Sequence, residues 1–285
     1  MLADAIRSET YRLSKNRTAL FWSVLFIPII SVVLGVIAII VAKAHEADLA
    51  GKLPPELLQR APLNLAESLV KSAADFANPI VLLFILIGAA TIYAGDYRWE
   101  TWRLISARNT RPNLLTGKVV VVIGLTVLAT LAGLLADIIT HLVQALILSR
   151  SLGFSMDGAA FTDFVQLTLL SWARIIQFTM LALLAATVTR SLLAALFVPL
   201  VISVAQFFLP QMLMQMGVSP EGWLAPLLSP GLATDLLKAV IHGGMEAAGL
   251  PPQAALKAVT GLALWIVGPF VAAVAYFNRQ DLSKE

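Results

Sequence analysis

The 285-residue sequence has no cysteine and few charged residues. Without cysteine there is no disulfide framework, thiol nucleophile or thiolate metal site. Charged residues make up 13% and hydrophobic residues 59% of the chain, whereas soluble domains are about 25% charged and 45–50% apolar. This excess of apolar residues exceeds what one globular core can bury, so the composition predicts an integral membrane protein.

Several motifs of soluble enzymes are also missing. Gly51-Lys52 and Gly117-Lys118 are followed by leucine and valine, where a P-loop requires serine or threonine. The pair His45-Glu46 begins the H-E-x-x-H pattern of zinc proteases, but residue 49 is leucine. We therefore expect no cofactor bound by this chain, no metal site and no P-loop ATP site.

The net charge of +3 and the pI of about 9.3 do not indicate a nucleic-acid partner. The basic residues lie beside apolar runs, which suits anionic lipid headgroups and the control of membrane topology. We expect membrane lipid as a partner and no nucleic acid.

Six apolar segments are long enough to span a bilayer, which requires about 20 residues. They cover residues 19–42, 79–95, 118–148, 163–188, 192–211 and 256–277. The predicted fold class is therefore an all-α integral membrane protein, with residues 1–285 forming a single six-span domain.

Two further helices are expected at membrane surfaces. Residues 1–17 have apolar side chains at helical spacing and basic ones mostly elsewhere, which predicts an amphipathic interfacial helix. Residues 212–255 contain a short amphipathic helix that begins at Ser229-Pro230 and is stopped by Gly249 and the prolines after it. Because it is too short to cross the bilayer, we expect a re-entrant or outer helix between spans five and six.

Two capping signals locate helix starts before the second span. Asn64 and Glu67 form an N-x-x-E pattern, which predicts a short outer helix, and Pro79 stands at the expected first position of span two.

Basic residues are more numerous in the segments on the N-terminal side of the membrane, twelve against seven, although the opposite segments are longer. By the positive-inside rule, both termini are expected in the cytoplasm.

Polar residues form stripes on the third and fourth spans. The third carries, at spacings of three or four, Thr126, Thr130, Gly133, Asp137, His141 and Gln144, and the fourth carries Ser171, Arg174 and Gln177. Charges within a membrane should face protein or water, so we expect Arg174 to reach Asp137. The stripes fit either a polar substrate route or a structural seam between helices.

Residues 96–117, between spans two and three, form the most charged stretch of the chain. One interpretation is a positive-inside loop with aromatic anchors at the headgroup level. The other is a docking site for a cytoplasmic partner, with Trp99, Glu100, Trp102, Arg103 and Leu104 as its contact residues.

This arrangement resembles the type-2 ATP-binding-cassette (ABC) exporter permeases, a family of small six-span bacterial membrane subunits. Their connecting helix carries E-x-x-K/R-x-x-x-x-R, matched here by Glu9, Arg12 and Arg17. After span two, the family has an acidic residue followed by G/W-T, then S/T-R-x-x-x-x-x-GK and finally a closing F-x-R-R/K-D-L. Similar residues here are Glu100-Thr101-Trp102, Thr110-Arg111 with Gly117-Lys118, and the segment 276–282, in which Gln280 departs from the pattern.

The resemblance implies a permease subunit of an exporter in the bacterial cytoplasmic (inner) membrane. A second permease subunit, identical or homologous, would pair with it, and two separate ATPase subunits would bind and hydrolyse ATP. Residues 97–111 would be the coupling helix, and the 212–255 segment would roof the outer exit. The substrate is not indicated.

Two other classes remain open on the residues alone. An ion-coupled transporter or channel subunit would use Asp137, His141 and Arg174 as an ion or proton relay. An intramembrane enzyme would use Asp137 and His141, which are adjacent at i,i+4, as an acid–base pair.

Overall fold

The structure is a computed structural model that describes residues 1–50, 62–219, 222–243 and 249–281. The N-terminal part consists of α1 (Leu2–Lys15), α2 (Arg17–Leu20), the π-helical turn η1 (Phe21–Leu25), α3 (Phe26–Ala50), β1 (Leu63–Asn64), α5 (Leu65–Asp75), α6 (Pro79–Arg98) and α7 (Trp102–Ser106). The remainder consists of α8 (Arg111–Leu148), β2 (Leu152–Gly153), α9 (Gly158–Thr189), α10 (Leu192–Gln215), α11 (Leu224–Leu228), α12 (Pro230–His242) and α14 (Ala254–Arg279).

The predicted all-α membrane fold is confirmed. Among the described residues, five helices are long and apolar enough to cross a membrane: 17–45, α6, α8, α9 and α14. A sixth span results if the two parts of α10 count as one. The strands β1 and β2 are only two residues each and pair in parallel, a feature that no sequence pattern predicted.

The helix starts follow from local capping chemistry. Asn64 accepts a hydrogen bond from the backbone of Ala66 at the start of α5, and Asn78 caps α6 immediately before Pro79. Ser229 caps α12, with Pro230 at its first position as predicted. A side-chain oxygen at the N-cap satisfies a backbone N–H that has no partner inside the helix, which fixes where each helix begins.

Two boundaries differ markedly from the prediction. Helix α8 begins at Arg111 instead of residue 118, so two of its turns lie before the apolar run. Helix α12 ends at Gly243, whose φ of +65° favours glycine, and not at Gly249. The pair Pro54-Pro55, which predicts a break in the polar segment after the first span, lies outside the described residues.

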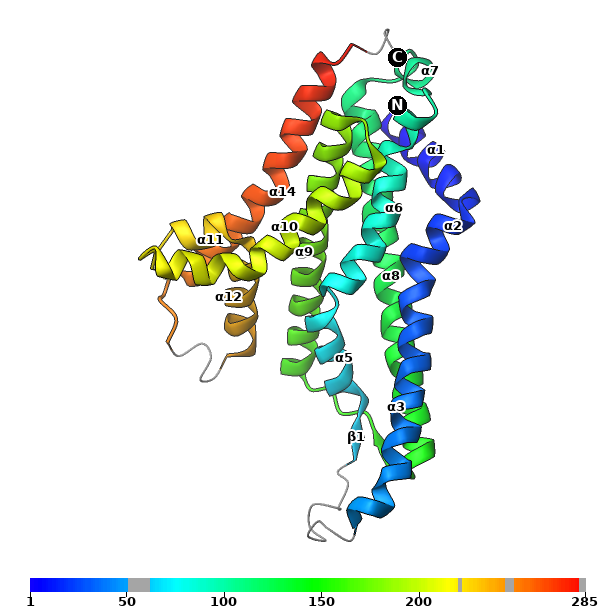
Figure 1. The fold of residues 1–285 in the computed structure, drawn as a ribbon, viewed down its shortest axis with the longest axis vertical. Helices are drawn as coiled ribbons and strands as arrows, with labels where there is room; N and C mark the ends of the chain where they lie inside the picture. Colours follow the sequence, from blue (N-terminus) through cyan, green and yellow to red (C-terminus); the bar gives the residue numbers. More distant parts are fainter. Residues whose placement is uncertain (51–61, 220–221, 244–248, 282–285) are drawn as a thin grey trace.

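The fifth span, predicted over residues 192–211, contains a sharp bend. The two parts of α10, 192–206 and 208–215, are bent by 47°. Pro210 lacks an N–H and therefore cannot bond to the carbonyl of Gln206, four residues earlier, which accounts for a break at this position. The bend leads the chain toward α11 and α12 at the side of the bundle (Figure 1).

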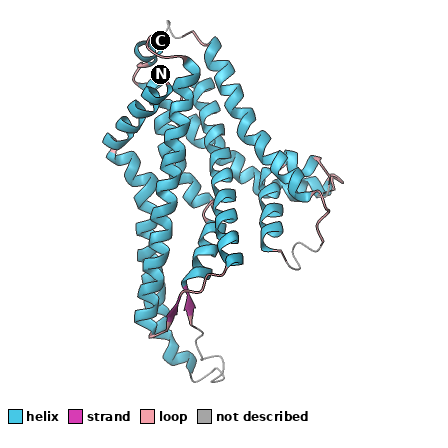
Figure 2. Ribbon diagram, turned by 180° about the vertical axis from the view of Figure 1, so that it is seen from behind, coloured by secondary structure: helices cyan, strands magenta, loops and turns pink. Residues whose placement is uncertain are grey.

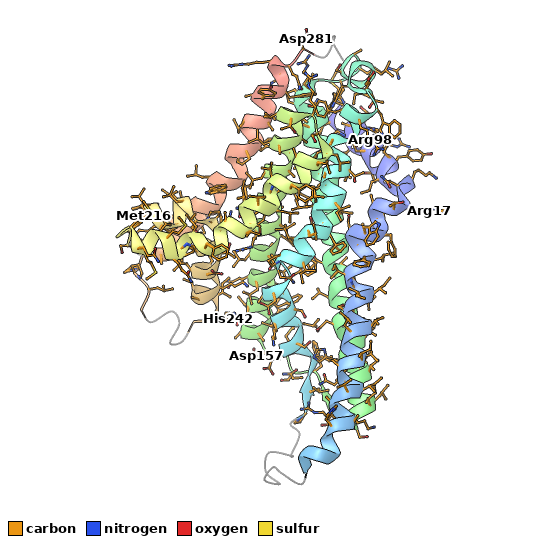
Figure 3. All side chains as sticks on the ribbon, viewed as in Figure 1. Arg17, Arg98, Asp157, Met216, His242 and Asp281 are labelled. Carbon is orange, nitrogen blue, oxygen red and sulfur yellow. The ribbon has the colours of Figure 1, made fainter. Side chains whose placement is uncertain are left out.

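Both termini and α7 lie at one end of the elongated bundle, and β1 lies toward the other (Figures 1 and 2). Arg98 and Asp281 mark the terminal end, whereas Asp157 lies toward the opposite end (Figure 3). The main core consists of buried side chains of α6, α8, α9 and α14. The first span contacts α6 and α8 but is largely exposed, so its apolar surface requires lipid or another subunit to cover it.

Candidate coupling site and the polar groups of the spans

The segment between α6 and α8 makes a sharp turn at the terminal end of the molecule. Glu100 has a φ of 52°, in the left-handed region that a residue with a Cβ rarely adopts. The turn exposes Glu100 and two large apolar side chains, Trp99 at 67% and Leu104 at 73%. The side chain of Arg103 lies outside the described part of the chain. Trp99 and Leu104 thus present apolar surface at the end that carries both termini.

Trp102 was predicted to be a contact residue for a partner, but the structure buries it completely. Its ring lies 4.6 Å from that of Phe277 on α14 and 5.4 Å from that of Tyr97 on α6, measured between centroids. The Lys118 ammonium lies 5.3 Å from the Trp102 ring centroid. Trp102 therefore anchors α7 from behind, and the exposed surface of the segment is formed by its neighbours.

A network of four charged side chains lies directly beneath this segment. Glu9 and Arg12 come from α1, Asp96 from the end of α6 and Lys118 from α8. Arg12 bonds to Glu9 at 2.9 Å and to Asp96 at 2.7 Å, while Lys118 contacts Glu9 at 3.2 Å and Asp96 at 2.5 Å. Asp96 is fully buried and Lys118 is 1% exposed. Each acid thus contacts both bases, and the network has no net formal charge.

Further contacts connect this network to the exposed turn. Thr101 donates a hydrogen bond to Asp96, and Lys118 donates to the carbonyl of Ile92 at 2.8 Å. Burial lowers the pKa of the Arg12 guanidinium, but its bonds and charge interactions with Asp96 and Glu9 outweigh this and raise that pKa above its ordinary value. Arg12 therefore remains charged, the ion pairs join α1, α6 and α8, and the Thr101 hydroxyl connects the start of α7 to Asp96.

The C-terminal end of α14 joins the same site. Arg111 donates hydrogen bonds to three of its last carbonyls, those of Phe277 at 2.6 Å, Asn278 at 3.1 Å and Gln280 at 2.8 Å. A cation at a helix C-terminus binds carbonyls that have no partner inside the helix. The Gln280 amide lies 3.1 Å from the Tyr97 hydroxyl. We call this whole set of contacts, from Glu9 to Gln280, the junction.

Sequence reasoning singled out Glu9, Arg12, Arg111 and Lys118 only as parts of separate motifs. It missed Asp96, which is the centre of the network, although an acid at the end of an apolar span was a usable signal. Such a charge requires a partner, and Lys118 stands at the corresponding end of the next span.

The polar stripe of the third span divides into two parts. Thr126 and Thr130 are buried, and each bonds to a carbonyl of its own helix. Thr130 also accepts a hydrogen bond from the Trp172 indole of α9 at 2.9 Å. This half of the stripe is a helix–helix seam.

The other half of the stripe contains Asp137, and its predicted pairing with Arg174 is wrong. Asp137 accepts a hydrogen bond from Ser68 of α5, and His141 lies 3.6 Å from its carboxylate. Arg174 instead lines a pocket together with Asp235 of α12. The pairing fails because the outer helices bring other groups to the two spans: Ser68 of α5 bonds to Asp137, and Asp235 of α12 lines the pocket that contains Arg174.

Ser68, Asp137 and His141 lie together but are not arranged as a catalytic triad. The same His141 nitrogen, Nδ1, faces the Ser68 hydroxyl at 3.2 Å, the Asp137 carboxylate at 3.6 Å and the Asp137 carbonyl at 3.0 Å. A charge relay requires the two ring nitrogens to serve the serine and the acid separately.

The two glutamines of the stripes differ in their surroundings. Gln144 is half-buried near the end of α8. Gln177 of α9 is fully buried, and its amide has no hydrogen-bond partner among the described residues. Within the described ranges, no group of three histidine or acidic residues is placed to hold a metal ion.

Comparison with known proteins identifies the family. A model of the ABC-2 family transporter proteins matches residues 5–282, nearly the whole chain. Searches of curated proteins and of solved structures found no match. The match includes the spans, the exposed turn and the junction beneath it, and the chain therefore belongs to the ABC-2 family of membrane permeases of ABC transporters.

Proposed function

We propose that the chain is the permease subunit of an ABC exporter and that a separate ATPase subunit docks on the 99–106 segment. ABC-2 family membership implies partnership with an ABC ATPase in general. The observation that carries the docking site is the pair of exposed apolar side chains, Trp99 and Leu104, on a turn fixed from behind by the junction. Tryptophan is among the side chains that contribute most to the binding energy of protein interfaces, and Leu104 adds exposed apolar surface beside it.

The junction explains how a small displacement of this segment reaches the spans. Thr101 is bonded to Asp96 at the end of α6, and Trp102 packs on Phe277 at the end of α14. Lys118 connects the same group to α8. Because buried ion pairs and packed rings resist separation, movement of α7 should move the ends of three spans together.

The orientation and assembly follow from the same proposal. Both termini lie at the end that carries α7, so docking of a cytoplasmic ATPase there places both in the cytoplasm. The exposed apolar surface of the first span provides room for a second permease subunit. Two permeases would then bind two ATPases in a bacterial inner membrane, with export powered by ATP bound on the partner chains.

Cross-linking can test the docking site directly, because the chain has no cysteine. A single cysteine at Leu104, and a matched one at the similarly exposed Leu146 of α8, would be introduced into the permease co-expressed with its candidate ATPase. Under a short thiol-reactive photo-cross-linker, Leu104→Cys should yield the permease–ATPase adduct and Leu146→Cys should not. Equal yields at both positions, or no adduct at 104 from a complex that copurifies, would refute the docking site.

A functional measurement separates docking from coupling. Leu104→Asp should weaken copurification of the ATPase, because it places a charge in an apolar contact. Leu104→Met keeps the apolar contact and should retain both copurification and permease-dependent ATP hydrolysis. If Leu104→Asp left both quantities at the wild-type level, the segment would not be the ATPase contact.

A further inference from the structure

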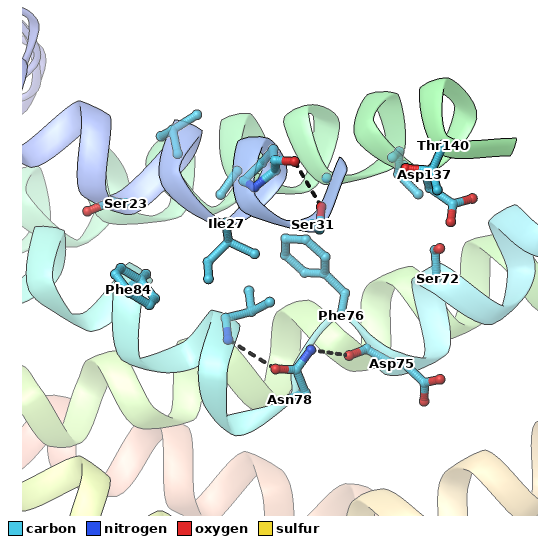
Figure 4. Close-up of a pocket in the computed structure, with 16 residues that line it drawn as sticks. Ser23, Ile27, Ser31, Ser72, Asp75, Phe76, Asn78, Phe84, Asp137 and Thr140 are labelled. Atoms are coloured by element: carbon cyan, nitrogen blue, oxygen red, sulfur yellow. Dashed lines mark hydrogen bonds between the residues drawn. The ribbon is translucent and has the colours of Figure 1, made fainter. Parts of the chain in front are cut away.

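A cavity of about 340 Å³ lies between the first span, α5, α6 and α8 (Figure 4). It is far from the junction, because it is lined by the start of α6 and by the half of α8 that contains Asp137. Small-molecule pockets range from roughly 300 to 1,000 Å³. The cavity is therefore large enough for a small organic molecule.

One part of the lining is apolar and aromatic. Ile27, Phe76 and Phe84 project into this region from three different elements (Figure 4). The Phe84 ring also packs against those of Phe26 and Trp22, with centroids 4.7 and 6.0 Å away. Aromatic faces carry partial negative charge and attract organic cations.

The other part of the lining carries acidic and hydroxyl groups. Asp137, Ser72 and Thr140 gather at one end, and Asp75 lies below them in Figure 4. Among the described residues that line the cavity there are two carboxylates and no lysine, arginine or histidine. The lining therefore carries a net negative formal charge.

The groups around Asp137 do little to neutralise the negative charge of its carboxylate. Its hydrogen-bond donor is the neutral hydroxyl of Ser68, and the nearest basic group is the His141 imidazole at 3.6 Å. Asp75 differs, because it is mostly exposed and lies 3.8 Å from Lys238. Asp137 is thus the stronger candidate for contact with a cation inside the cavity.

Two backbone features border the cavity. A Cβ at Gly133 would approach Phe76 Cε2 to 2.8 Å, so only glycine allows the ring to lie where it does. The π-helical turn Phe21–Leu25 contributes Ser23 and Val24 to the lining. Such turns frequently occur at functional sites in helices.

We propose that this cavity binds an organic cation with an apolar body, its positive charge facing Asp137 and its body lying against Phe76 and Phe84. The binding depends on the permease alone and not on the proposed ATPase contact. The proposed cation site can therefore be correct even if the ATPase docking site is wrong, and the docking site can be correct even if the cation site is wrong.

Two ions of the same shape and opposite charge provide the test. Equilibrium dialysis would measure binding of tetraphenylphosphonium, a cation, and tetraphenylborate, an anion, to the permease in lipid nanodiscs, with empty nanodiscs as background. We expect saturable binding of the cation, at least about tenfold tighter than that of the anion, because one unscreened carboxylate distinguishes them. Equal affinity for both ions, or no saturable binding of the cation, would overturn the proposal.

Three variants localise the binding. Asp137→Asn should weaken cation binding about tenfold, whereas Glu67→Gln, which removes an exposed acid from α5 outside the cavity, should not change it. Ser72→Lys places a positive charge in the cavity while retaining Asp137, and should weaken the cation and strengthen the anion. If Asp137→Asn yields too little folded protein, the Ser72→Lys variant still tests the site through the change in its preference between cation and anion. An unchanged preference for the cation in that variant refutes the site.

Discussion

Replacing Lys118 with methionine should destabilise the fold by about 3–5 kcal/mol, the usual cost of breaking a buried ion pair by removing one partner. Its ammonium is 1% exposed and lies 2.5 Å from Asp96 and 3.2 Å from Glu9. At an effective dielectric constant of about 20, Coulomb's law gives roughly 5–7 kcal/mol for each contact. Burying the charge costs several kcal/mol, so the net loss is smaller than the sum of the contacts.

The double variant distinguishes a charge network from simple packing. Lys118→Met alone leaves two acids with one base, and Asp96→Asn alone leaves two bases with one acid. The two changes together leave the Arg12–Glu9 pair, at 2.9 Å, with no net charge. The double variant should therefore be more stable than the sum of the single losses predicts, by about 2–3 kcal/mol.

A double-mutant cycle requires the unfolding free energies of the wild type, both single variants and the double variant. These can be measured by steric trapping in detergent or bicelles. Lys71→Met removes an exposed lysine from α5 and is the control, with an expected change within about 0.5 kcal/mol. Additivity of the Lys118 and Asp96 variants within about 0.5 kcal/mol would show that these groups do not act as a pair. That result would refute the network as the connection between the spans.

Other residues give further predictions. Glu100→Gly should be about 1 kcal/mol more stable than Glu100→Ala by thermal unfolding, because glycine adopts the φ of 52° without strain; equal stability would mean that the turn relaxes. Asp137→Asn and Arg174→Gln should show additive losses of unfolding free energy within about 0.5 kcal/mol, since the two groups have different neighbours, and a coupling above 1 kcal/mol would contradict this. Arg111→Met should speed hydrogen exchange at the end of α14 several-fold, because three carbonyls lose their donor; unchanged exchange would show that the cap is dispensable.

Features encoded by neighbouring residues were predictable from the sequence. Ser229-Pro230 starts α12, and Asn78-Pro79 starts α6, because each capping interaction spans only three or four residues. The bend of α10 is also encoded locally, in Pro210, but the sequence analysis gave only the extent of this span and no bend.

Contacts between distant segments were not predictable in the same way. The pairing of Asp137 with Arg174 was inferred from depth in the membrane alone, whereas the actual neighbours depend on how α5 and α12 pack across the spans. Trp102 is of a residue type that commonly anchors helices at the membrane interface. Its ring is nevertheless covered by Phe277, which lies 175 positions further along the chain. One sequence gives the periodicity of each helix but not its rotation relative to the others.

The two polar regions of this permease, the junction and the cavity at Asp137, differ in how far their charges are neutralised by neighbouring groups. In the network of Glu9, Arg12, Asp96 and Lys118 each acid contacts both bases, so these four side chains have no net formal charge and are suited to holding helix ends together. At the 340 Å³ cavity, the polar partners of the Asp137 carboxylate among the described residues are a hydroxyl and an imidazole, which leaves it available to the proposed cation. Loss of a charge should therefore reduce stability in the first region and ligand affinity in the second. The charges that surround a polar residue in an apolar span thus indicate whether it stabilises the fold or binds a ligand. In this permease those surrounding charges are known for both regions.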